Sequence, residues 1–127
     1  MIKYGSYLIC KEHVREVKDF LGEFFEEKKD KYNHENWVTF VVPNTDFKIN
    51  LMKGSDQSIT QNMTFEIYCE SKEGLEKYAK KHNLEIESFV ATETSQPYTY
   101  YYIEILGPYN ICKIEVNYCE DLKGNTP

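Results

Sequence analysis

The chain has 127 residues, with 15 Lys and Arg against 21 Asp and Glu, so its formal net charge is −6. This length suits one domain over residues 1–127, and 41% hydrophobic with 28% charged residues excludes a disordered chain. The acidic balance excludes non-specific nucleic-acid binding, which depends on neutralising phosphates with Lys and Arg. No stretch approaches the roughly 20 apolar residues of a membrane-spanning helix, so no membrane partner is predicted.

The N-terminus has no basic segment followed by a long apolar one, so we expect a cytoplasmic protein without a signal peptide. Four cysteines, Cys10, Cys69, Cys112 and Cys119, fall in or beside predicted strands without a metal-type spacing. We therefore expect reduced thiols that pack as small hydrophobes. Aromatic residues make up 15% of the chain, including 11 Tyr, which can fill a core or line a pocket.

In the first half, residues 2–10 are rich in β-branched and aromatic side chains and predict a strand. From Val14 onward apolar residues recur at helical spacing through Phe25, which predicts a helix. The mixed-charge run 26–31 is interpreted as the solvated end of that helix. Residues 37–42 and 47–52 predict two further strands, so this half has the order strand, helix, strand, strand.

The second half predicts a strand at 63–69 and a helix at 72–82 that Ser71 caps. Three more strands follow, at residues 85–90, 98–105 and 111–118, and residues 120–127 are expected to be loose. The two halves thus repeat one pattern, as module one at about 1–56 and module two at about 61–119. A ferredoxin-like α+β sandwich is the alternative that uses the strands differently.

Three segments, which are spread over nearly the whole chain, carry a family resemblance. Residues 7–25, 66–79 and 107–116 resemble the opening strand and helix, the second module's opening and the closing hairpin of the vicinal oxygen chelate superfamily. That superfamily includes glyoxalase I, ring-cleaving dioxygenases and bleomycin-resistance proteins. His13 stands where the family usually has Asp, and Gly107 replaces another Asp. The resemblance implies an α+β fold of two βαβββ modules that form a cupped mixed β-sheet, and a homodimer.

Metal-dependent members of that superfamily hold a divalent ion with four inward-facing His or Glu side chains. The resemblance carries those positions onto Ser6, Asn50, Thr64 and Glu115, of which only Glu115 is a strong ligand. Neutral hydroxyl and amide oxygens would hold even a Ca²⁺-like ion weakly. We therefore predict no metal and no cofactor, and lean against an enzyme. Glu115 is the best candidate for a catalytic residue if the chain is one.

Alternation along strands predicts which side chains share the concave face with these positions. In the strand 98–105, Tyr100, Tyr102 and Glu104 lie on one face, and either this face or the opposite one lines the cup. Trp37, at the start of a strand, is expected at its mouth. High strand propensity alone would also explain the tyrosines. The predicted ligand-binding residues are Tyr4, Ser6, Trp37, Asn50, Thr64, Glu66, Tyr100, Tyr102 and Glu115.

Aromatic walls with a few carboxylates are typical of a site for a planar or cationic small molecule. We predict a metal-free binding protein for a small aromatic or cationic ligand, similar to the drug-sequestering members of the superfamily. Two alternatives stay open. One is a metal-dependent lyase, isomerase or dioxygenase of the same superfamily, and the other is a protein-interaction module.

Overall fold

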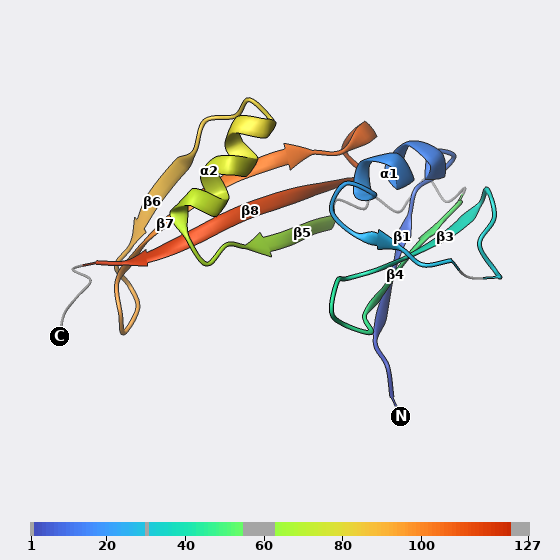
Figure 1. The fold of residues 1–127 in the computed structure, drawn as a ribbon, viewed down its shortest axis with the longest axis horizontal. Helices are drawn as coiled ribbons and strands as arrows, with labels where there is room; N and C mark the ends of the chain where they lie inside the picture. Colours follow the sequence, from blue (N-terminus) through green and yellow to red (C-terminus); the bar gives the residue numbers. More distant parts are fainter. Residues whose placement is uncertain (1, 30, 55–62, 123–127) are drawn as a thin grey trace. The chain divides into compact units, whose positions relative to one another are not determined.

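The structure is a computed structural model that describes residues 2–29, 31–54 and 63–122. The chain divides into two compact units, each with a four-stranded sheet and one α-helix (Figure 1). The first unit takes the residues up to Met63 together with Gly107–Cys112, and the second takes Thr64–Leu106 and the residues from Lys113 onward. No described helix is both long and apolar enough to cross a membrane.

The sheet of the first unit is mixed and has the order β1-β4-β3-β2. Its central strand β4 pairs in parallel with β1 and antiparallel with β3, which in turn pairs with β2. Val14, Val17 and Leu21 bury one stripe of helix α1. The elements are β1 (Gly5–Ile9), α1 (Val14–Leu21), β2 (Glu26–Glu27), β3 (Trp37–Val41) and β4 (Lys48–Met52).

The sheet of the second unit has the order β5-β8-β7-β6, which repeats the order of the first. Leu75 and Ala79 bury the inner stripe of α2, and Ser71 caps this helix by accepting a hydrogen bond from the Gly74 N–H, as predicted. The elements are β5 (Met63–Tyr68), α2 (Lys72–Lys81), β6 (Glu87–Ala91), β7 (Tyr98–Leu106) and β8 (Cys112–Asp121), with a short 3-10 turn, η1 (Pro108–Asn110), between β7 and β8.

The predicted α+β fold of two repeated βαβββ modules is confirmed. Both modules run strand, helix, three strands, and both sheets place the last strand of the module next to its first. The ferredoxin-like alternative is wrong, because the described strands form two separate four-stranded sheets. In the sequence the two halves share only the order of their predicted elements. In the structure they also share the order of strands within the sheet.

The predicted solvated helix end at residues 26–31 is wrong. Helix α1 ends at Leu21, and Glu26–Glu27 forms the edge strand β2, which pairs with Val41 and Phe40 of β3. Gly22, which follows the last helical residue, is a poor helix former and costs about 1 kcal/mol relative to Ala in a helix interior. Pairing with β3 satisfies the backbone hydrogen-bonding groups of Glu26 and Glu27. It also gives the first module a third strand after its helix, which the sequence prediction lacked.

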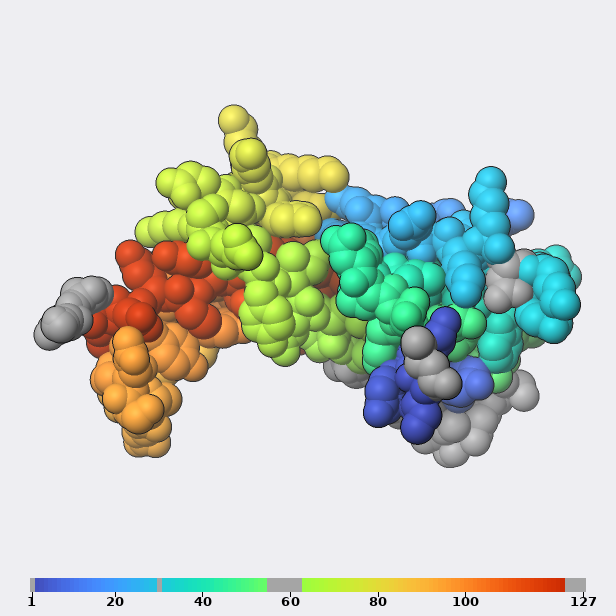
Figure 2. All heavy atoms as spheres, turned by 60° about the horizontal axis from the view of Figure 1, so that its bottom comes forward, coloured from blue at the N-terminus to red at the C-terminus, as the bar shows by residue number. Residues whose placement is uncertain are grey.

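The sequence predicts a loose tail over residues 120–127, and this is wrong for Glu120 and Asp121. Strand β8 continues through Asp121, with Glu120 and Asp121 paired to Thr99 and Tyr98 of β7. Figure 2 shows the β6–β7 connection, in orange, gathered beside the red end of β8. Gln96 of that connection donates a hydrogen bond to Asp121 at 3.1 Å, which explains why the strand extends. Residues 123–127 lie outside the described part of the chain.

The four cysteines are free thiols. Cys10 and Cys112 are buried, and burial raises the pKa of Cys10 to about 12 and that of Cys112 to about 11. Both thiols are therefore protonated at neutral pH and pack as apolar groups. Cys119 is exposed on β8 and Cys69 is half-buried, so the expectation of core packing fits the first two and does not fit Cys119.

Candidate functional site

One face of the second unit's sheet combines aromatic rings with carboxylates. Helix α2 lies over one side of this sheet (Figure 1). Tyr101, whose ring Lys72 of α2 contacts, shares this side with the buried Ile103 and Ile105, and alternation puts Tyr100 and Tyr102 on the opposite side. The pairing register extends this side, since Tyr100 pairs with Phe89 of β6 and Tyr102 with Asn117 of β8. We call this surface the acid–aromatic face and define it by Glu66, Phe89, Tyr100, Tyr102, Glu115 and Asn117.

Three rings of the acid–aromatic face contact one another. The Phe89 ring stacks on Tyr100 at 5.1 Å between ring centroids and meets Tyr102 edge-on at 6.2 Å. The two tyrosine rings lie 5.8 Å apart. Phe89 is nevertheless 51% exposed, so the three rings pack against one another while the outer side of the cluster faces solvent. Its outer surface is available to a planar ligand.

Glu104 lies on the same side of β7 as Tyr100 and Tyr102 and is a third carboxylate of this side. The other two, Glu66 and Glu115, are held by neutral donors. The Tyr100 hydroxyl donates a hydrogen bond to Oε2 of Glu115, and Nδ2 of Asn117 donates to the same oxygen at 3.0 Å. The same Nδ2 lies 3.3 Å from Oε2 of Glu66, so one buried amide links both carboxylates. Among the described residues neither carboxylate has a Lys, Arg or His partner, whereas Glu104 pairs with Lys113 at 3.1 Å.

The phenols beside these carboxylates stay neutral. Burial, followed by the hydrogen bond and charge of Glu115, raises the pKa of Tyr100 well above its ordinary value. The pKa of Tyr68, which lies on β5 as Glu66 does, is raised chiefly by its hydrogen bond to Glu66. Both hydroxyls therefore remain hydrogen-bond donors at neutral pH, and the uncompensated charge of the face is that of Glu66 and Glu115.

The first unit presents a second surface, on the side of its sheet opposite α1. Tyr7 pairs with Asn50 of β4, which also pairs with Thr39 of β3. The buried Thr39 hydroxyl donates to Oδ1 of Asn50 at 2.9 Å, which fixes the carboxamide. Tyr7 and Trp37 meet edge to face at 5.7 Å. A pocket of about 790 Å³ opens over these residues.

The structure places the predicted site residues unevenly. Glu66, Tyr100, Tyr102 and Glu115 come together on the acid–aromatic face. Trp37 and Asn50 line the pocket of the first unit, and Thr64 is exposed on β5. Their roles in binding stay predictions.

Two other placements differ from the sequence prediction. Ser6 pairs with Ile49, whose buried side chain lies on the helix-covered side, so Tyr7 rather than Ser6 shares a face with Asn50. Tyr4 precedes β1 and is 72% exposed; only its carbonyl, which accepts a hydrogen bond from the Lys48 N–H, joins the sheet. The pairing of β1 with β4, which crosses most of the module, sets this register.

Three residues of these surfaces are missing from the predicted set. Asn117 shares the alternation of Glu115, and that signal could have identified it. Phe89 and Tyr7 could not be assigned, because the partner strands that bring them beside Tyr100 and Asn50 are defined only by the fold.

Metal-dependent members of the superfamily that the sequence resembles hold a divalent ion, and the residues at the four corresponding positions of this chain do not fit one. Asn50 Oδ1 already accepts from Thr39, and Glu115 Oε2 accepts from both Tyr100 and Asn117. Ser6 shares the side of its sheet with Ile49 rather than with Asn50. Among the described residues no three His, Cys, Asp or Glu side chains are grouped to hold an ion. The set offers one carboxylate and no imidazole, which is a poor donor set for such metals.

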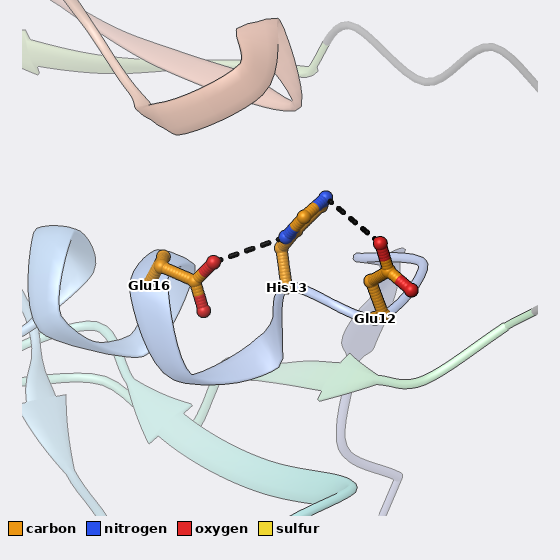
Figure 3. A network of polar contacts seen from close by, with 3 residues as sticks. All are labelled: Glu12, His13 and Glu16. Carbon is orange, nitrogen blue, oxygen red and sulfur yellow. Dashed lines mark hydrogen bonds and ion pairs between the residues drawn. The ribbon is translucent and has the colours of Figure 1, made fainter.

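His13 belongs to a separate polar network at the start of α1 (Figure 3). Its Nδ1 lies 3.0 Å from Oε2 of Glu16, its Nε2 lies 3.8 Å from Oε1 of Glu12, and its ring stacks on Tyr109 at 3.6 Å. Tyr109 has φ 56°, the left-handed region that a non-glycine residue adopts only at some cost. The network therefore joins the first turn of α1 to the turn between β7 and β8, within the first unit.

Replacing Glu16 by Gln is expected to destabilise the protein at neutral pH and to destabilise it less in acid. The hydrogen bond from His13 lowers the pKa of Glu16 in the folded state. A carboxyl with such a pKa adds stability above its unfolded pKa, and this is lost as the pH falls through the folded pKa. Urea unfolding at neutral pH and at about pH 3 measures both values. A difference that stays constant with pH would contradict this, and Glu76→Gln on the exposed side of α2 is the control.

Comparison with protein-family models and with curated proteins gives no match. Solved structures do match over nearly the whole chain. A member of the glyoxalase/bleomycin resistance protein/dioxygenase superfamily from Sphaerobacter thermophilus has a TM-score of 0.54 at 10% identity, covering 93% of this chain and 97% of its own.

Two further solved structures are similar to a comparable degree. An antibiotic binding protein from a Streptomyces species has a TM-score of 0.56 at 12% identity, with 93% and 95% coverage of the two chains. A lactoylglutathione lyase from Agrobacterium tumefaciens has 0.57 at 14% identity, with 92% coverage of each. The predicted resemblance is confirmed at the level of the fold: the chain has the fold of the glyoxalase/bleomycin resistance/dioxygenase superfamily.

Proposed function

We propose that this protein binds a small planar aromatic cation on the acid–aromatic face. The observation that carries the proposal is the pair Glu66 and Glu115, two carboxylates without a cationic partner among the described residues, beside three contacting rings. Aromatic faces attract cations through their quadrupole, and a nearby carboxylate adds a charge-assisted hydrogen bond. The formal charge of −6 favours the approach of a cation.

Two further observations support binding rather than metal chemistry. The residues at the four positions carried over from the metal-dependent members are a poor donor set for a divalent ion, and an antibiotic binding protein shares the fold. The structural neighbours also include a lyase, but no observation on the described residues favours that activity. The homodimer, the single domain and the cytoplasmic location stay predictions from the sequence.

The test uses three probes with one ring system and three charges: naphthylmethylammonium, naphthamide and naphthoate. Calorimetry should show that the ammonium binds about tenfold more tightly than the neutral amide. This ratio corresponds to about 1.4 kcal/mol, which is close to the contribution of one hydrogen bond to a charged group. Glu115→Gln should weaken ammonium binding about tenfold and leave amide binding unchanged. The matched control Glu76→Gln removes a charge from α2 and should change neither affinity.

Two results would overturn the proposal. One is equal affinity of the ammonium and the amide for the wild-type protein, which would mean that the carboxylates do not select charge. The other is an equal loss of ammonium affinity in Glu115→Gln and Glu76→Gln. That outcome would reduce the effect to the net charge of the chain.

A further inference from the structure

The pocket of the first unit has the opposite electrostatic character to the acid–aromatic face. Its volume of about 790 Å³ lies within the usual range of small-molecule sites. Two lysines are among its lining residues and none of the described lining residues is acidic. The lining residues are Tyr7, Lys31, Tyr32, Asn33, His34, Trp37, Thr39, Lys48 and Asn50.

Lys48 supplies one cation of this pocket, and it also lines another pocket of the first unit together with Glu26, Glu27 and Asp46. It lies on β4, paired with Gly5 and Val41, and its side chain is half-buried. Among the described residues no carboxylate lies within ion-pair distance of Lys48. A half-buried lysine with no carboxylate within ion-pair distance among the described residues can pair with an anionic ligand group.

The rim of the pocket is built by hydrogen bonds that hold the segment between β2 and β3 against the sheet. Asn33 accepts from the Thr39 N–H at 3.2 Å and donates to the Lys28 carbonyl at 2.8 Å. His34 and Trp37 exchange two backbone hydrogen bonds, at 2.8 and 3.0 Å. These contacts place Lys31 and the Trp37 ring on the same rim.

The pocket has one aromatic wall and a polar group beside it. The edge-to-face pair of Tyr7 and Trp37 gives an aromatic wall, and the carboxamide of Asn50 is held in place by Thr39 and by the Ser6 carbonyl. A planar ring can therefore stack at the wall while an anionic substituent reaches Lys48. A cationic ligand would meet Lys31 and Lys48 without a compensating carboxylate on the described lining.

The geometry points to a second binding site in the first unit, for a small aromatic carboxylate held between Trp37 and Lys48. It takes a ligand of the opposite charge to the one proposed for the acid–aromatic face and rests on different residues. It therefore stands whether or not that proposal holds.

The single tryptophan makes this site directly observable, because Trp37 gives the only indole N–H signal in an ¹H–¹⁵N spectrum. Naphthoate should shift this signal in a saturable manner, and naphthamide should bind at least about tenfold more weakly. Lys48→Met should weaken naphthoate about tenfold. Lys77→Met, a matched loss of one exposed lysine on α2, should leave naphthoate affinity unchanged. If Lys48→Met does not fold, Lys31→Met on the exposed rim replaces it, with a loss of about threefold expected.

The inference is overturned if naphthoate leaves the indole signal in place, or if naphthoate and naphthamide bind with equal affinity. It is also overturned if Lys48→Met and Lys77→Met weaken naphthoate equally, since only net charge would then matter. A shift of the indole by naphthoate without any binding of the ammonium probe would support this site and count against the proposed function. The two proposals can thus fail separately.

Discussion

Replacing both Glu66 and Glu115 by Gln is expected to cost about 2 to 3 kcal/mol of binding free energy for naphthylmethylammonium, roughly a thirtyfold to 150-fold loss of affinity. The pair holds all the uncompensated negative charge of the acid–aromatic face, since Glu104 is paired with Lys113. Glutamine keeps the shape of each side chain and a carbonyl acceptor for Asn117. The loss therefore reports the charge, and calorimetry on the folded variant measures it.

The two single replacements should not add up to the double. Nδ2 of Asn117 is shared between the two carboxylates, and neighbours in one hydrogen-bond network couple. A double variant whose loss is no greater than the effect of Glu76→Gln would contradict cation binding by this pair.

Phe40→Ala is expected to lower the free energy of unfolding by about 3 to 5 kcal/mol, the usual cost of removing a large buried aromatic side chain. Phe40 is 1% exposed and is the largest fully buried side chain among the described residues. Its neighbours in the register, Ile49 of β4 and Glu27 of β2, fix its place in the first unit. Urea unfolding followed by circular dichroism measures the change.

Phe47→Ala is the matched control for this prediction. Phe47 lies just before β4 and is 38% exposed, so its removal should cost about 1 kcal/mol or less. Similar costs for the two variants would mean that Phe40 is not enclosed in a packed core.

Most of the fold is predictable from the sequence because it depends on local periodicity. The predicted strands and the helix after Ser71 appear within a few residues of their predicted bounds, since alternation and helical spacing are properties of neighbouring residues. The missed strand β2 has only two residues, Glu26 and Glu27, and carries no apolar signal of its own. It exists because β3 offers an open edge, a property of the assembled sheet.

The sequence predicts which site residues share a face when they lie on the same strand. It does not predict which residues of two different strands lie side by side. Alternation within a single strand is enough to place Tyr100 and Tyr102 on one face. The pairing of β1 with β4 places Tyr7 rather than Ser6 opposite Asn50, and a shift of one residue exchanges the faces of a strand. The contact of Phe89 with Tyr100 likewise needs the register of β6 against β7.

The most direct test of cation binding on the acid–aromatic face is an ¹H–¹⁵N titration with naphthylmethylammonium. We expect the Asn117 side-chain amide, which touches both carboxylates, to shift together with the backbone amides of Phe89, Tyr100 and Tyr102, while the Trp37 indole stays in place. A titration in which the Asn117 amide does not move while the Trp37 indole does would contradict cation binding on this face.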